Sequence, residues 1–192
     1  METIRAFIAV DIPREVKEKF SEAQGKLRRS GADVRWVQPH NAHITLQFLG
    51  DTPVEKIEDI KTVLGRVTLS HHAFEVAIEG LGVFPNPRRP RVVWIGVSKG
   101  ANELAALQTS VGEEMRRLGF QPEERAFSAH ITLGRVKSPK NTEKLGSLLE
   151  MEKGFQAGHF LATEIRLIRS VLSSEGPTYT PLFSAALLAA SG

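Results

Sequence analysis

Hydrophobic residues follow two different periods along this chain, and the periods alternate from one segment to the next. Runs rich in Ile, Val, Phe and Leu, several of them alternating with polar residues, are typical of strands. We predict strands over residues 4–12, 34–37, 42–49, 73–78, 92–97, 127–136, 155–161, 164–172 and 178–188.

Apolar residues spaced by three and four positions predict helices between these strands. Thr52-Pro53-Val54-Glu55 indicates a helix start, with Thr as the cap, Pro at the first helical position and Glu completing a capping box. We predict helices from Pro13 to about Arg29, from Thr52 to Leu64, from Gly100 to Leu118, and over residues 142–149.

The order of these elements favours antiparallel pairing. Strands and helices mix as β-α-β-β-α-β-β with hairpin-like neighbours, instead of in strict βαβ units. A chain of 192 residues is long enough for one domain or two small lobes. We therefore predict an α+β fold with antiparallel sheets and helices on their outer faces.

One five-residue sequence occurs twice. Ala42-His43-Ile44-Thr45-Leu46 recurs as Ala129-His130-Ile131-Thr132-Leu133, and the two copies are separated by close to half the chain. That period is too long for a solenoid. We predict a single domain over residues 1–192, made of two intertwined, pseudo-symmetric lobes that each carry one His-x-Thr motif, at 43–46 and 130–133.

Side chains alternate between the two faces of a strand, so each motif separates polar from apolar residues. In the first copy the alternation places His43, Thr45 and Gln47 on one face. It places Ile44, Leu46 and Phe48 on the other. In the second it places His130, Thr132 and Gly134 against Ile131 and Leu133. If each apolar set is buried under its own lobe, the two polar faces meet across a central cleft.

Two histidines in one cleft suit phosphodiester chemistry. A neutral imidazole accepts a proton from the attacking oxygen and a protonated one donates to the leaving oxygen, and a pKa of about 6.5 lets both forms coexist. The hydroxyls of Thr45 and Thr132 and the guanidinium of Arg135 can hold the non-bridging oxygens. Strict alternation places Arg135 on the apolar face, so this role needs a bulge, which Gly134 allows. The pattern leaves the acid and base roles of the histidines interchangeable.

The composition of the chain excludes several kinds of protein and of functional site. The chain has no Cys, which excludes a disulfide scaffold, a thiolate metal site and a Cys nucleophile, and its histidine spacing does not fit a zinc site. A formal charge of +3 permits an anionic partner without requiring one. The apolar segment at the N-terminus has no basic region before it and ends at Asp11, so we expect neither a signal peptide nor a membrane span, but a cytoplasmic protein.

Other residues have simpler explanations. Phe48 is most simply a core residue by parity, although at a strand end its ring can stack on a base. An Arg-rich loop is more often a solvated turn than a guide for an anionic polymer, and a lone His is usually solvated or capping. These residues are Arg88, Arg89 and Arg91, and His40, His71, His72 and His159.

The doubled motif resembles that of the two-histidine (2H) phosphoesterase superfamily. Within it, the chain is similar to the bacterial and archaeal RNA 2′,3′-cyclic phosphodiesterases, also called 2′-5′ RNA ligases. The matching segments cover most of the chain: Arg5 to Val10, Arg35 to Pro39, His43 to Gly50, Val83 to Arg91, and His130 to Arg135. The resemblance implies a bilobal fold with a central cleft.

The resemblance also implies hydrolysis of a terminal 2′,3′-cyclic phosphate on RNA, such as a tRNA fragment, to a 2′-phosphate without metal or other cofactor. Reversal of related chemistry joins a 2′,3′-cyclic end to a 5′-hydroxyl and gives 2′-5′ ligation. His43 is then the proton donor, His130 the proton acceptor, and substrate contacts come from Thr45, Thr132, Arg135 and, as a base contact, Phe48. No obligatory protein partner is implied, and we expect a monomer. Two alternatives remain: a relative acting on small cyclic nucleotides or an ADP-ribose cyclic phosphate, and a non-catalytic RNA-binding protein.

Overall fold

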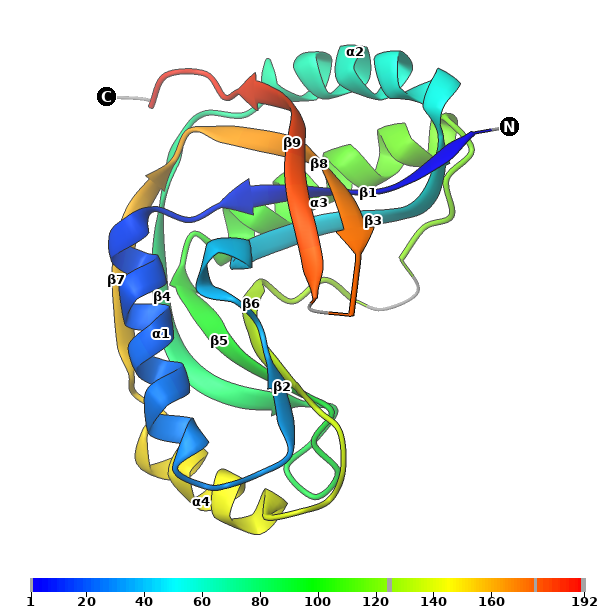
Figure 1. Cartoon of the computed structure of the whole chain (residues 1–192). Coiled ribbons are helices and arrows are strands. Elements are labelled where there is room, and N and C mark those ends of the chain that lie inside the picture. The colour runs from blue at the N-terminus through cyan, green and yellow to red at the C-terminus, as the bar shows by residue number, and fades with distance from the viewer. Residues whose placement is uncertain (1, 124–125, 175, 191–192) are drawn as a thin grey trace.

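A computed structural model describes residues 2–123, 126–174 and 176–190 of the chain (Figure 1). In these residues nine strands form one hydrogen-bonded sheet in the order β7-β4-β5-β6-β3-β1-β8-β9, with β2 paired to β6. All of the strand pairings are antiparallel. The strands are β1 (Thr3–Asp11), β2 (Val34–Trp36), β3 (His43–Pro53), β4 (Phe74–Phe84), β5 (Val92–Lys99), β6 (His130–Val136), β7 (Gln156–Ala162), β8 (Glu164–Leu172) and β9 (Pro177–Ala186).

A row of four aliphatic residues joins the two halves of this sheet. Ile44 in β3 pairs with Ile131 in β6, and on either side Val10 pairs with Ile44 and Ile95 with Ile131. All four side chains are no more than 2% exposed. The two antiparallel sheets predicted from the sequence are therefore joined edge to edge through the motif strands, and they bury one continuous core.

The helices cover the buried face of the sheet, two on each half. α2 (Ile57–Thr68) and α3 (Ala101–Arg117) pack on the half formed by β3, β1, β8 and β9. α1 (Arg14–Arg28) and α4 (Thr142–Met151) pack on the other half, as Figure 1 shows. Each helix that precedes a motif strand thus covers the opposite half, which intertwines the two halves. In the described residues, no helix combines the length and the apolar character that crossing a bilayer requires.

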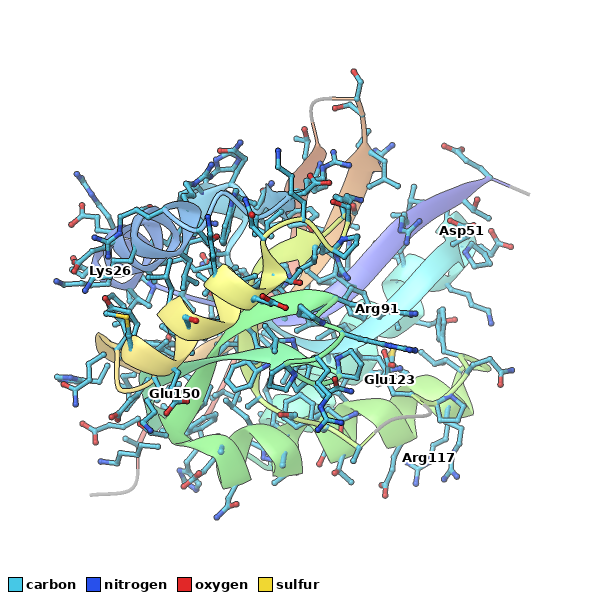
Figure 2. The ribbon with its side chains drawn as sticks, turned by 90° about the horizontal axis from the view of Figure 1, so that it is seen from below. Lys26, Asp51, Arg91, Arg117, Glu123 and Glu150 are labelled. Atoms are coloured by element: carbon cyan, nitrogen blue, oxygen red, sulfur yellow. The ribbon has the colours of Figure 1, made fainter. Side chains whose placement is uncertain are left out.

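α1 and α4 lie side by side, and Figure 2 labels Lys26 and Glu150 on them. The Lys26 ammonium is 2.8 Å from a carboxylate oxygen of Glu152, at the end of α4, and 5.5 Å from the centre of the Phe155 ring. Both partners of the ion pair are partly exposed, so the pair contributes at most about 1 kcal/mol. The ammonium lies over the ring, so a cation–π contact adds to the ion pair.

The predicted helix start at Thr52 is wrong. Strand β3 continues to Pro53, because Thr52 still pairs with Ile4 of β1, and its hydroxyl donates to the Gly50 carbonyl at 3.2 Å. A short 3₁₀ turn, η2 (Val54–Lys56), follows and α2 begins at Ile57. Pairing with β1 stabilises the extended form more than the local capping signal stabilises a helix.

Candidate active site

The pairing of β3 with β6 brings the two motifs together. Ile44 and Ile131 lie directly opposite each other and point into the core. The flanking residues of both strands therefore point to the other face, where His43 and Thr45 meet His130 and Thr132. In this register the two histidines are diagonal neighbours on adjacent strands, about 7–8 Å apart at the backbone. The predicted meeting of the polar faces is confirmed by this arrangement.

Each motif strand carries a bulge at the same place. Opposite β1, the register skips Leu46, because Ala9 pairs with Thr45 and Ile8 with Gln47. Opposite β5, it skips Leu133 in the same way, because Trp94 pairs with Thr132 and Val93 with Gly134. Both leucines follow their motif histidine by three positions, so the bulges are a further sign of the repeat.

The bulges change which later residues face the cleft. An extra residue reverses the alternation beyond it. Arg135 is consequently exposed on the cleft side, as the proposed role of Gly134 requires. Gly134 also permits close packing, because a Cβ there would lie 2.6 Å from Cγ1 of Val34.

Two predictions from strict alternation are wrong for the same reason. Phe48 is not a core residue: it is 56% exposed and lines the cleft. Gln47 does not share the face of His43: it is 2% exposed, and its Oε1 lies against Gly112 of α3. The bulge at Leu46 exchanges their faces.

The motifs open into a cavity of about 560 Å³. His43, Thr45, His130 and Thr132 all line it. The β8–β9 hairpin, including Tyr179, forms another wall. Among the described residues that line this cavity there is no Asp or Glu, whereas four are cationic. These are Arg5, Arg35, Arg135 and Lys137. Such a lining favours an anionic ligand.

Backbone carbonyls hold both imidazoles in the same way. Nδ1 of His43 donates to the carbonyl of Asn41 at 2.7 Å, and Nδ1 of His130 donates to that of Ser128 at 2.7 Å. A carbonyl can only accept, so Nδ1 keeps its proton and Nε2 is the nitrogen that gains or loses one. Nε2 of His43 is also 2.9 Å from the hydroxyl of Thr45.

The two rings differ in their surroundings. His43 stacks on Phe7 with a centroid distance of 4.7 Å and meets the edge of Tyr179, whereas His130 meets Phe84 edge-on at 5.0 Å. Burial lowers the pKa of both imidazoles below the ordinary value. The carbonyls of Asn41 and Ser128 partly offset the effect of burial on the pKa of His43 and His130 respectively. Among the charges, Asp11 raises the pKa of His43 and Lys17 lowers it, while Arg135 lowers the pKa of His130.

Several cavity residues were not recognised from the sequence alone. Arg5, Arg35, Lys137 and Tyr179 line the cavity, but they lie on four different segments whose pairing no local pattern reveals. Asn41 is 4% exposed, and its side-chain amide donates to the Pro177 carbonyl at 2.8 Å, which anchors the backbone that holds His43. The only local signal for it is the Pro-containing lead-in before the first motif.

The remaining candidates lie outside the cavity. The Arg-rich loop is exposed, and Figure 2 shows Arg91 extending from the ribbon just before β5. His71 Nε2 lies 3.0 Å from the Ser110 hydroxyl, and His72 Nδ1 donates to the Ala189 carbonyl at 2.7 Å. His40 and His159 are exposed and do not line the cavity.

One sheet built from two similar halves, with a His-x-Thr motif at the start of each central strand, defines a two-histidine phosphoesterase. The chain belongs to the LigT-like phosphoesterase family: the family described as "LigT like Phosphoesterase" matches residues 10–94 and, a second time, residues 95–179. The two matches correspond to the two halves of the sequence repeat.

Relatives and solved structures agree with this assignment. A protein named RNA 2′,3′-cyclic phosphodiesterase from Methanothermobacter thermautotrophicus is 39% identical to this chain, over 93% of this chain and 96% of its own. A protein of the same name from Archaeoglobus fulgidus is 41% identical, over 93% of this chain and 98% of its own. The crystal structure of TT0787 of Thermus thermophilus has a TM-score of 0.81 at 29% identity, covering 96% of this chain and 98% of that one. That of E. coli LigT complexed with 3′-AMP has a TM-score of 0.78 at 29% identity, covering 97% and 99%.

Proposed function

We propose that this chain hydrolyses the terminal 2′,3′-cyclic phosphate of RNA to a 2′-phosphate. The observation that carries the proposal is the Ile44–Ile131 pairing. It points two histidines and two threonines toward one cavity that is lined by cationic side chains. The names of the relatives support the RNA substrate, and the 3′-AMP complex of E. coli LigT is consistent with a nucleotide in such a cleft. Both motifs come from one chain, so we propose a single domain of two halves that works as a monomer. We also propose the cytoplasm as its location.

In the proposed reaction His130 is the base and His43 is the acid. Nε2 of His130 takes a proton from water as the water oxygen attacks phosphorus. The bond from phosphorus to the 3′ oxygen breaks, and Nε2–H of His43 protonates that oxygen. The product has a 2′-phosphate and a 3′-hydroxyl, and both imidazoles return to their starting states by proton exchange with solvent. The same groups acting in the same direction, with an RNA 5′-hydroxyl in place of water, would join two ends by a 2′-5′ linkage.

Charged neighbours support this division of roles. The largest charge effect on His43 comes from Asp11, its partner in the β1–β3 register, which favours the protonated imidazole. Arg135 favours the neutral form of His130. The two rings therefore differ in the sign of their largest charge effect, although Lys17, which is paired with Asp11, partly offsets the effect of Asp11 on the pKa of His43.

The substrate phosphate lies between the two motifs in this proposal. Thr45 and Thr132 donate hydroxyl hydrogens to its non-bridging oxygens, and Arg135 neutralises the charge that grows on them. Phe48 offers its exposed ring to the terminal base. The cavity lining supports a reaction without a metal ion, because four cationic side chains repel a divalent cation.

The function is tested with a short RNA that ends in a 2′,3′-cyclic phosphate. We expect hydrolysis to be unchanged by excess chelator, and the product to carry a 2′-phosphate, identified by mass spectrometry and by its resistance to a 3′-specific phosphatase. A 3′-phosphate product would show that the other P–O bond breaks. Loss of activity with chelator would overturn the metal-independent mechanism.

The pH dependence of kcat/KM is a separate prediction. The reaction needs one neutral and one protonated imidazole, so the profile should be bell-shaped, and kcat/KM reports the free enzyme. Burial lowers the pKa of both rings from 6.5, so both limbs should lie on the acid side of that value and the maximum below it. The two limbs belong to the coupled pair of histidines. A maximum on the alkaline side of neutrality would contradict the burial of the rings in the working enzyme.

A further inference from the structure

Three cationic residues gather at one end of the cavity, more than the reacting phosphate needs. Arg35 in β2 lies directly opposite Arg135 in β6, and Lys137 follows Arg135 by two residues, about 7 Å further along the chain. All three line the cavity. We call Arg35 and Lys137 the outer basic pair.

Like charges directly opposite each other in an antiparallel pair are destabilising. Within the ranges that the structure describes, no salt bridge involves Arg35, Arg135 or Lys137. Arg35 extends across the cavity to the β8–β9 hairpin. Its Nη2 lies 3.9 Å from where a Cβ would lie if Gly176 had one. The cyclic phosphodiester carries one negative charge, and Arg135 is sufficient to meet it. The outer basic pair is therefore left for another anion.

The two ends of the cleft are chemically different despite the repeat. Position for position from each motif histidine, Phe48 corresponds to Arg135 and Gly50 corresponds to Lys137. One end therefore presents an aromatic ring and a glycine, with Arg5 of β1 beside them, and the other presents three cationic side chains. A nucleotide whose base lies on Phe48 and whose reacting phosphate lies between the motifs leaves the basic end for its own backbone.

We propose that Arg35 and Lys137 form a second phosphate subsite, which binds the phosphodiester linkage on the 5′ side of the terminal nucleotide. The inference rests on the proposed function and specifies its substrate: an RNA strand of at least two nucleotides. The linkage supplies one more negative charge, and the fork of Arg35 and the ammonium of Lys137 supply donors for its oxygens. The enzyme then prefers an RNA strand to a mononucleotide as its substrate.

The Arg-rich loop provides a matched control. Arg88 and Arg89 are exposed and do not line the cavity. Their backbone amides donate to the side chain of Asn86, each at 3.1 Å, so the loop conformation does not depend on their guanidinium groups. Replacing both by Gln removes the same charge as replacing the outer basic pair by Gln.

The test compares two substrates, a nucleoside 2′,3′-cyclic phosphate and the dinucleotide that ends in the same group. We expect the wild-type enzyme to have a higher kcat/KM on the dinucleotide. The R35Q/K137Q variant should lose about tenfold more on the dinucleotide than on the mononucleotide, which is the effect of about 1.4 kcal/mol of binding energy. The R88Q/R89Q variant should keep the wild-type ratio. Binding of the dinucleotide product should also lose about 0.7 from its salt slope in R35Q/K137Q, because one phosphate is no longer neutralised.

The outcomes separate this inference from the function on which it rests. Wild-type enzyme that hydrolyses neither substrate overturns the proposed function. Wild-type enzyme that hydrolyses both, with an unchanged ratio in R35Q/K137Q, overturns the second subsite alone. An equal loss in R88Q/R89Q also overturns it, because general surface charge would then explain the preference. The exposed single change K137Q tests the subsite with less risk to folding, and it should lower the ratio in the same direction.

Discussion

Replacing His130 by alanine is expected to lower kcat/KM on RNA ending in a 2′,3′-cyclic phosphate by about 10²–10⁴-fold, the usual contribution of one general acid or base. His43→Ala should have an effect of similar size. The proton transfers act together in one displacement, so the double variant should be little worse than either single one. The measurement is single-turnover hydrolysis with enzyme in excess.

His159→Ala is the matched control for both changes. His159 is exposed on β7 and does not line the cavity, so its removal should leave activity at the wild-type value. Thermal melting of all variants checks that they are folded. Activity within a fewfold of wild type after His43→Ala or His130→Ala would exclude acid–base catalysis by these residues.

Ile131→Ala is expected to lower the free energy of unfolding by about 2–5 kcal/mol, as for other fully buried Ile and Leu side chains. Ile131 is 1% exposed and belongs to the aliphatic row that joins the two halves. The cavity left behind lets β3 and β6 shift against each other, and the two histidines shift with them. Because 1 Å of misplacement can cost about 10²-fold in rate, kcat per folded molecule should fall as well. Urea unfolding measures the first effect and single-turnover rates the second.

Ile78→Ala separates the two effects. Ile78 is also 1% exposed, but it lies in β4, away from the junction. It should lose a similar amount of stability and keep the wild-type rate per folded molecule. If Ile131→Ala also keeps the wild-type rate, the positions of the two histidines do not depend on the aliphatic row that joins the two halves.

Most of the architecture could be predicted from local patterns. The helical periodicity from Leu104 to Met115 reflects a face that is buried in the structure, and strands occur in all of the segments where they were expected. The repeat indicated two halves and placed a histidine in each. Two identical polar pairs at matching positions are informative because a core has no use for them.

Register and bulges could not be predicted, because they depend on pairing between distant segments. The faces of Gln47 and Phe48 were assigned by parity, and one extra residue at Leu46 exchanges them. The Leu133 bulge had a local signal in Gly134, but nothing local places Arg35 opposite Arg135. The exchange of α1 and α3 between halves likewise follows from tertiary packing alone.

The central claim is that both imidazoles act on one phosphate. A crystal structure of the chain with an RNA dinucleotide carrying a terminal 2′-phosphate tests it most directly. We expect Nε2 of His43 and Nε2 of His130 each to lie about 2.6–3.2 Å from an oxygen on or next to the same phosphorus. A phosphate that contacts only one of the two rings, or that binds outside the cavity, would contradict the account.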